Sequence, residues 1–108
     1  MIPLKAGHKY SLKNLKDKGD TLLTFYCDPK INGVRYKGPS TQEVLRACID
    51  RVKFLEGQVS APENIDILFH LRSAIILFEY RALRRLVEKG DEIETITTNK
   101  DGHIFNVA

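Results

Sequence analysis

Three arginines near the end of a long helical segment carry the clearest chemistry in this sequence. Arg81 and Arg85 are four residues apart, so a helix places them one above the other on one face, with Arg84 beside them. Guanidinium groups bind phosphate through pairs of parallel hydrogen bonds, and a rigid helix holds such groups in place. The alternative is that these arginines and Lys89 only complement the negative end of the helix dipole.

An aromatic residue lies close to the same helix face. Phe78 precedes Arg81 by three residues, and Ala74, one turn further back, leaves room beside both side chains. Two guanidinium groups next to a flat ring provide phosphate binding together with a surface on which a purine can stack. The pattern therefore indicates a site for a nucleotide-like ligand.

Two further residues have the chemistry to contact such a ligand. Phe54 is expected to point away from the apolar stripe of its helix, beside Arg51, so it either stacks on a base or packs in a sheet or dimer interface. Asn64, in the first turn of the next helix, either reads a base edge or a hydroxyl or is a simple helix-end residue.

Catalytic and metal-binding patterns are not found in the sequence. The histidines His8, His70 and His103 are scattered, and neither Cys27 nor Cys48 has a ligand or a histidine at a useful spacing. No GxSxG turn, GxGxxG segment or P-loop is present. We therefore expect a protein that is not an enzyme, with two reduced thiols, no metal and no cofactor.

Composition narrows the function classes further. The chain has 108 residues, 43% hydrophobic residues and a net charge of +3, which predicts one domain with a modest core. Residues 1–40 carry a charge of +5 and residues 91–108 carry −3. A nucleic-acid surface spread over the whole protein is normally more basic. We find neither an apolar span nor a secretory signal, so we expect a cytoplasmic protein without a membrane partner.

The residues above are carried by two predicted helices. The first spans 41–56, with Ser40 and Glu43 forming a capping box and Gly57 ending the helix. The second spans 62–89, with Ser60 and Glu63 at capping-box spacing and Gly90 after its end. The apolar stripe of the first helix contains Val44, Leu45, Cys48, Ile49, Val52 and Leu55.

The apolar arc of the second helix is too wide for one partner helix, which predicts neighbours on two sides. Arg72 and Glu79 fall inside this arc, and this position implies an interior ion pair or a partner chain. The second helix is also expected to extend about 16 Å past the first, at its arginine-bearing end.

The remaining segments have the residue pattern of β-strands. Together with the two helices they predict an α+β fold. Strands are expected near 8–13, 21–28 and 33–37, with a type I′ turn at Asn32-Gly33. We expect the C-terminal hairpin to join these strands in one small antiparallel sheet. The predicted single domain, 1–108, has three parts: a β region at 1–38, an antiparallel two-helix hook at 39–90 and a C-terminal β-hairpin at 91–108.

The runs STQEVLRACIDRVKFL, PEN and LRSAIILFEYRALRR resemble the hook domain of phage anti-Thoeris and anti-CBASS sponge proteins. The β segments around the hook favour the anti-Thoeris branch. The resemblance implies a protein that sequesters a cyclic nucleotide signal of bacterial immunity without cleaving it. The ligand would be a cyclic ADP-ribose isomer, with cyclic di- or trinucleotides as further candidates. A second site in some members takes trinucleotides, for which Arg84 or Arg72 are candidates here.

The resemblance also implies a set of ligand-binding residues. These are Phe54, Asn64, Arg81 and Arg85, with Arg35 or Lys30 as the basic residue from the strand region. Asn64 and Arg81 lie 17 residues apart on one helix, which is about 25 Å. One small ligand cannot span that distance, so the pocket requires two protomers, in a homodimer or hexamer.

Two other functions are alternatives to the sponge. A small nucleic-acid-binding regulator would use the arginines on backbone phosphate. A signal-degrading phosphodiesterase would need a metal or a general base, and neither is identified in the sequence.

Overall fold

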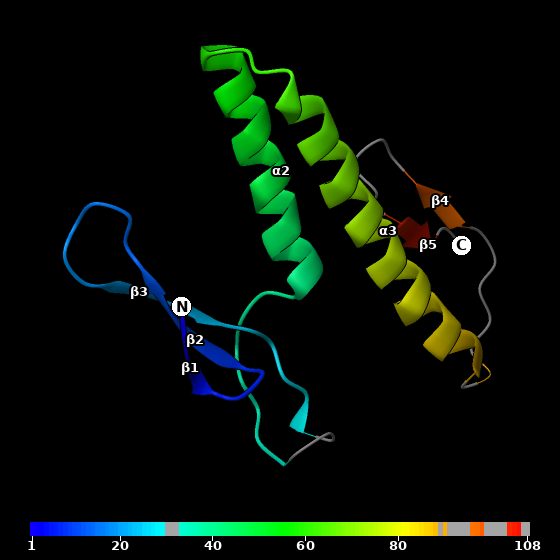
Figure 1. The fold of residues 1–108 in the computed structure, drawn as a ribbon. Helices are drawn as coiled ribbons and strands as arrows, with labels where there is room; N and C mark the ends of the chain where they lie inside the picture. The colour runs from blue at the N-terminus through cyan, green and yellow to red at the C-terminus, as the bar shows by residue number, and fades with distance from the viewer. Residues whose placement is uncertain (30–32, 89, 91–95, 99–103, 107–108) are drawn as a thin grey trace. The chain divides into compact units, whose positions relative to one another are not determined.

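The computed structural model describes residues 1–29, 33–88 and 90, together with the backbone of 96–98 and 104–106. The chain divides into two compact units, Met1–Thr41 and Gln42–Ala108, each of which is described by itself. Figure 1 shows the elements in chain order.

The N-terminal unit is built on a three-stranded antiparallel sheet in the order β1-β2-β3. Its strands are β1 (Ile2–Lys5), β2 (Lys9–Lys13) and β3 (Asp20–Thr24). Tyr10 pairs with Leu23 across β2 and β3, and its ring meets Phe25 edge-on. Strand β1 was not predicted, because it is short and contains Pro3, which an edge strand tolerates.

The segment predicted as a third strand at 33–37 forms only an isolated bridge. Cys27 and Tyr36 exchange two backbone hydrogen bonds of 3.1 and 3.2 Å, and no described strand forms around them. Gly33 has a φ of 76°, as the predicted turn requires, whereas Asn32 lies outside the described residues.

Gly38 approaches the end of β3 closely. A Cβ atom at this position would lie 1.9 Å from the carbonyl oxygen of Thr24, so only glycine fits there. The next residue, Pro39, accepts a hydrogen bond of 3.0 Å from the backbone N–H of Tyr26. These contacts hold residues 38 and 39 against the sheet.

The hook consists of helices α2 (Thr41–Gln58) and α3 (Glu63–Glu88), joined by a short loop (Figure 1). Ile49 of α2 and Ile75 of α3 are its buried apolar residues, only 3% and 0% exposed. Helix α2 continues through Gly57 to Gln58, so the prediction that the helix ends at Gly57 is wrong. The backbone N–H of Val59, just after the helix, still donates a hydrogen bond to the carbonyl of Leu55.

Helix α3 is the longer of the two helices by about 12 Å, somewhat less than the predicted difference. The prediction that Gly90 follows the C-terminal end of this helix is confirmed. Gly90 has a φ of 84° and donates its N–H to the carbonyl of Val87 at 2.9 Å.

Among the described residues, the C-terminal strands β4 (Ile96–Thr98) and β5 (Ile104–Asn106) form a two-stranded antiparallel sheet of their own. The prediction that they join the N-terminal strands in one sheet is therefore wrong. Pairing the two neighbouring segments in a hairpin closes a short loop. The loss of chain entropy is therefore smaller than for pairing with the distant N-terminal strands. The α+β class is confirmed by the three-stranded antiparallel sheet and the two helices.

Candidate functional site

A hollow of about 270 Å³ lies on α3 where the sequence predicted space beside an arginine. The described residues that line it are Ala74, Leu77, Phe78 and Arg81, which recur at helical spacing on one face. Three of these side chains are apolar, and the fourth is a cation. The lining is almost wholly apolar, so the hollow can take a flat or apolar group.

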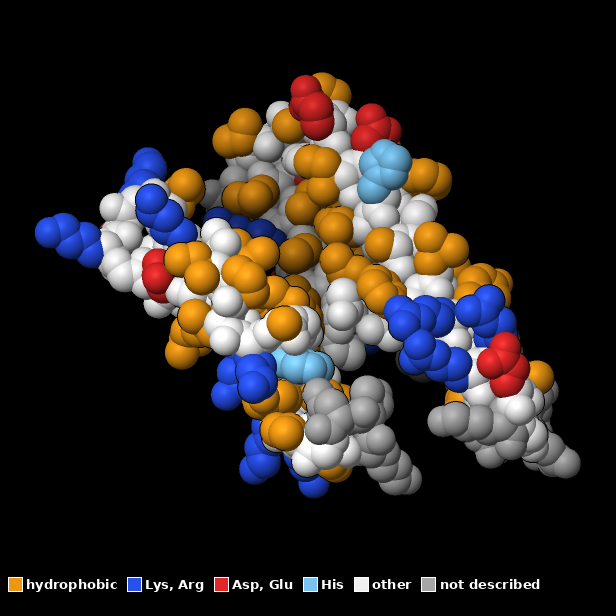
Figure 2. All heavy atoms as spheres, turned by 60° about the horizontal axis from the view of Figure 1, so that its bottom comes forward, with side chains coloured by type: hydrophobic (Ala, Val, Ile, Leu, Met, Phe, Trp, Pro, Cys, Tyr) orange, Lys and Arg blue, Asp and Glu red, His pale blue; other side chains and the backbone are white. Residues whose placement is uncertain are grey.

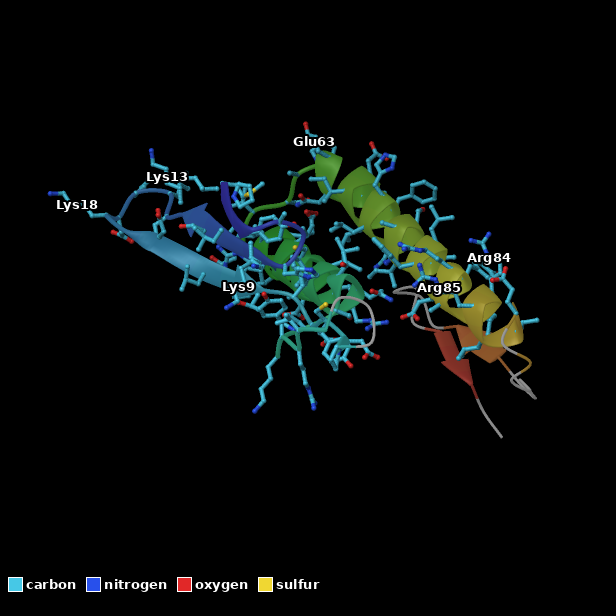
Figure 3. All side chains as sticks on the ribbon, turned by 90° about the horizontal axis from the view of Figure 1, so that it is seen from below. Lys9, Lys13, Lys18, Glu63, Arg84 and Arg85 are labelled. Atoms are coloured by element: carbon cyan, nitrogen blue, oxygen red, sulfur yellow. The ribbon has the colours of Figure 1, made fainter. Side chains whose placement is uncertain are left out.

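The three arginines differ in their partners. Arg84 Nε lies 3.8 Å from Glu88 Oε1, and both side chains are well exposed. Within the described part of the chain, Arg81 and Arg85 form no ion pair. Figure 3 shows Arg84 and Arg85 at one end of α3 and Glu63 at the other, and Figure 2 shows Lys and Arg side chains gathered near that C-terminal end.

Arg84 thus has the ordinary surface role that the helix-dipole interpretation gives it. No described residue pairs with the guanidinium group of Arg81 or Arg85, and a guanidinium group is the kind of group that binds an anion through paired hydrogen bonds. Arg85 does not line the hollow with Arg81; it follows one turn later on the same helix.

Phe54 projects away from the core of the hook, as predicted. Its side chain is 56% exposed, and the guanidinium carbon of Arg51 lies 5.9 Å from the centre of its ring. This contact is a cation–π interaction that presents an aromatic face and a cation together on the outer side of α2. The structure leaves both the stacking and the interface interpretations of Phe54 open.

Asn64 is held by a residue that the sequence reading did not single out. Its side-chain Nδ2 donates a hydrogen bond of 2.6 Å to Glu56 Oε2, which also accepts the backbone N–H of Ala61 at 3.1 Å. Glu56 Oε1 accepts the hydroxyl of Ser60 at 2.5 Å. The predicted capping box between Ser60 and Glu63 is thus replaced by a link to α2.

The three donors act on the ionisation of Glu56. The hydrogen bonds from Ser60, from Asn64 and from the backbone of Ala61 lower the pKa of its carboxyl, in that order of effect. The spacing of Glu56 and Ser60 at the end of a helix was the only sequence signal for this cluster.

An ion pair between the helices sets the register of the hook. Arg46 of α2 bonds to Glu79 of α3 and, at 3.1 Å, to Glu43 one turn earlier on its own helix. The prediction that Glu79 requires an interior partner is confirmed. The side chains of Arg46 and Glu79 are about four-fifths buried, so this pair favours one alignment of the two helices over others.

The hook separates the predicted site residues. Phe54 and Glu56 are two positions apart on α2, so their side chains leave the helix in nearly opposite directions, and Asn64 is on the Glu56 side. Arg81 lies far along α3 from Asn64.

Arg35 is exposed in the N-terminal unit, and its role in ligand binding stays a prediction. Lys30 lies outside the described residues.

Helix α3 exposes a broad apolar face. The exposed apolar face, as we use the term, comprises Ile65 (75% exposed), Phe69 (63%), Leu77 (70%), Tyr80 (57%) and Val87 (58%). These residues turn away from the buried Ile75, and Figure 2 shows hydrophobic side chains along the length of the hook. The arc that we predicted to need two neighbours thus has one side uncovered by the described residues.

Comparisons with known proteins identify no relative. The chain matches no protein-family model, no curated protein and no solved structure. Among the described residues, no cluster of His, Cys, Asp and Glu is arranged to hold a metal ion. None of the described helices combines the length and apolar character that crossing a membrane requires.

Proposed function

We propose that this protein is a phage anti-defence sponge that binds a cyclic nucleotide immune signal and holds it without cleaving it. The hollow beside Arg81 is the observation that carries the proposal. It combines an aromatic ring with open space above Ala74, and Arg81, which also lines it, forms no ion pair to a described residue. These features match the base and the phosphate of a nucleotide.

The proposed ligand is a cyclic ADP-ribose isomer, with cyclic di- and trinucleotides as further candidates. Its diphosphate would contact Arg81 and Arg85, which follow each other by one turn. Its adenine would enter the hollow of one protomer and stack on Phe54 of a second protomer, whose ring is more than half exposed beside Arg51. The protein would act in the cytoplasm of the infected cell.

Two protomers would form each pocket. Asn64 and Arg81 are about 25 Å apart along α3, so one ligand reaches both only if they come from different copies of the chain. The exposed apolar face of α3 supports such an assembly, because a second copy would cover it. Twofold symmetry would then give two equivalent pockets in a dimer, or six in a hexamer.

A second function is favoured by the same arginines. Arg81 and Arg85 would bind the phosphates of a nucleic acid as readily as those of a cyclic nucleotide. The hollow distinguishes the two functions, because backbone binding does not require it.

A substitution that fills the hollow tests the proposal. Ala74→Leu places a larger side chain beside Phe78 and Arg81 and leaves both arginines in place. We expect calorimetric titration with a ribose–ribose-linked cyclic ADP-ribose to show at least a tenfold loss of affinity. Ala82→Leu, on the same helix but outside the lining, is the matched control. Wild-type protein that retains duplex or single-stranded DNA but takes up no cyclic nucleotide would support the regulator instead.

A further inference from the structure

One face of the N-terminal sheet carries exposed aliphatic side chains between cations. Residues directly opposite each other on neighbouring strands share a face, and Ile2, Ser11 and Leu22 form such a row across the sheet. Ile2 and Leu22 are 61% and 72% exposed. Lys9 and Lys13 lie two positions to either side of Ser11 in β2, so they project from the same face. This side of the sheet, which we call the lysine face, is therefore aliphatic across its middle and cationic at both ends.

The lysines of this region are not paired with carboxylates of the described residues. Lys5 lies directly opposite Lys9, and like charges in that position repel each other. Residues 1–20 contain five lysines, all exposed, and none of them forms an ion pair with a described residue. Asp20, the acidic residue of the lysine face, accepts a hydrogen bond of 2.8 Å from the hydroxyl of Ser11. An external anion would relieve the repulsion between the two opposed lysines.

The hairpin between β2 and β3 continues this composition. Leu15 is 94% exposed, and Lys13, Lys16 and Lys18 are its basic neighbours in the sequence. Figure 3 shows Lys13 and Lys18 toward this hairpin and Lys9 nearer the other end of the sheet. The N-terminal unit thus offers a third exposed aliphatic side chain among cations.

We infer that the N-terminal unit attaches the protein to the surface of an anionic lipid bilayer, with Ile2 and Leu22 entering the headgroup layer and the lysines contacting lipid phosphates. Aliphatic side chains enter the boundary of the acyl chains, and lysines are attracted to anionic lipids. The expectation of no membrane partner rested on the lack of an apolar span, which attachment to a bilayer surface does not require. The inference is independent of the proposed function, which uses the hook.

Two other occupants fit the lysine face less well. Sheets that bind single-stranded nucleic acid present aromatic rings on which bases stack, whereas the row across this face is Ile2, Ser11 and Leu22. A second copy placed face to face would set the lysines of one copy against those of the other, because a twofold contact brings the same patch together. An anionic bilayer complements both the charge and the aliphatic side chains.

Co-sedimentation of the full chain with lipid vesicles tests the inference. We expect vesicles of phosphatidylglycerol and phosphatidylcholine in equal parts to bind roughly tenfold more tightly than vesicles of phosphatidylcholine alone. Added salt should weaken this binding, because it screens the lysines. Equal binding of the two vesicle types, or binding of neither, overturns the inference and leaves the hook's titration with cyclic nucleotide unaffected. A single-stranded oligonucleotide that binds more tightly than the anionic vesicles at the same salt also overturns it.

Variants separate the charge from the aliphatic contribution. Lys5→Gln should weaken binding to anionic vesicles about fivefold, which corresponds to about 1 kcal/mol for a lysine near an anionic surface. It should not lower the melting temperature, because it also removes the repulsion with Lys9. Leu22→Thr keeps a residue that favours strands and should weaken binding roughly threefold, since less apolar surface enters the bilayer.

The matched control is Arg84→Gln, which removes the same charge from the hook and should bind anionic vesicles like wild type. Circular dichroism establishes that each variant is folded, and Leu15→Ser, in the hairpin, replaces Leu22→Thr if that variant unfolds. Wild-type binding by Lys5→Gln or by the folded leucine variant overturns the assignment to the lysine face. An equal loss in Arg84→Gln overturns it as well, because the attraction would then follow net charge alone.

Discussion

Single residues decide whether the arginine cluster binds an anion or only complements a helix end. Arg84 is 3.8 Å from Glu88 and has a surface role in the structure. Arg81 borders the hollow with Phe78, and Arg85 lies one turn later. The helix-end interpretation fits the surface pair of Arg84, and anion binding by Arg81 and Arg85 stays a prediction.

The arginine substitutions give a graded prediction. Arg81→Ala or Arg85→Ala should weaken binding of a cyclic ADP-ribose isomer by roughly ten- to hundredfold, since each charge-assisted contact contributes about 1.5–3 kcal/mol. Arg84→Ala should change the affinity less than threefold. Calorimetric titration of the three variants checks this, and circular dichroism establishes that each is folded. Equal effects of all three substitutions would contradict the assignment.

Phe54 gives a second prediction at this scale. Phe54→Leu keeps an apolar side chain but removes the flat ring, and stacking on a base contributes roughly 1–3 kcal/mol. We expect normal folding and at least a fivefold loss of affinity for an adenine-containing cyclic nucleotide. Melting and binding should be measured on the same sample. A variant that melts much lower or dissociates would show that Phe54 belongs to the core or to an interface.

At the scale of elements, the loop between the helices depends on one ionised carboxyl. Three hydrogen bonds lower the pKa of Glu56, so its ionised form stabilises the folded hook. That contribution is complete above the ordinary pKa of a glutamate and is lost as the pH falls through the lowered value. The donors themselves carry no charge, so the effect follows the titration of Glu56.

The pH prediction compares wild type with Glu56→Gln, which resembles the protonated form. We expect wild type to melt at the higher temperature near neutral pH and the difference to disappear in acid. Thermal unfolding followed by circular dichroism between neutral pH and strong acid measures it. A difference in melting temperature that stays constant over this range would show that the charge of Glu56 is irrelevant to stability.

Two glycines give opposite predictions. A Cβ at position 38 meets the backbone of Thr24, so Gly38→Ala should destabilise the N-terminal unit by on the order of 2 kcal/mol. A Cβ at position 57 meets nothing within 4 Å in α2, so Gly57→Ala should stabilise the hook by roughly 0.5–1 kcal/mol. Denaturant unfolding of both variants checks the signs. A stabilising Gly38→Ala would refute the close approach.

The elements also show what the sequence could and could not predict. Helical periodicity located both helices, and the spacing of Ala74, Phe78 and Arg81 predicted which side chains share the hollow. A residue pattern within one segment does not indicate which other segment that segment will pair with or contact. For that reason β1 was missed, β4 and β5 were assigned to the wrong sheet, and the partners of Glu56 were not foreseen.

At the scale of the whole molecule, assembly is the property on which the proposed pocket depends. A pair of helices with one fully buried isoleucine and several exposed aromatic side chains has little core of its own. A second copy would cover the exposed apolar face of α3 and also bring Asn64 and Arg81 from different chains to one ligand.

We expect the protein to be a dimer or a multiple of one in solution. Phe69→Glu should dissociate the assembly, because it places a charge in the exposed apolar face, whereas Leu15→Glu, at a residue that is 94% exposed in the N-terminal unit, should not. Multi-angle light scattering at micromolar concentration measures both variants. A monomeric wild type would rule out the shared pocket.

Uptake and release of an intact signal test the central claim most directly. The protein is incubated with a ribose–ribose-linked cyclic ADP-ribose, separated from free ligand, and then denatured by heat. Mass spectrometry of the supernatant should recover the unaltered compound, in a ratio of about one ligand to one chain, and Arg81→Ala should recover far less. Recovery of an opened or hydrolysed product, or no uptake by the wild type, would contradict the sponge.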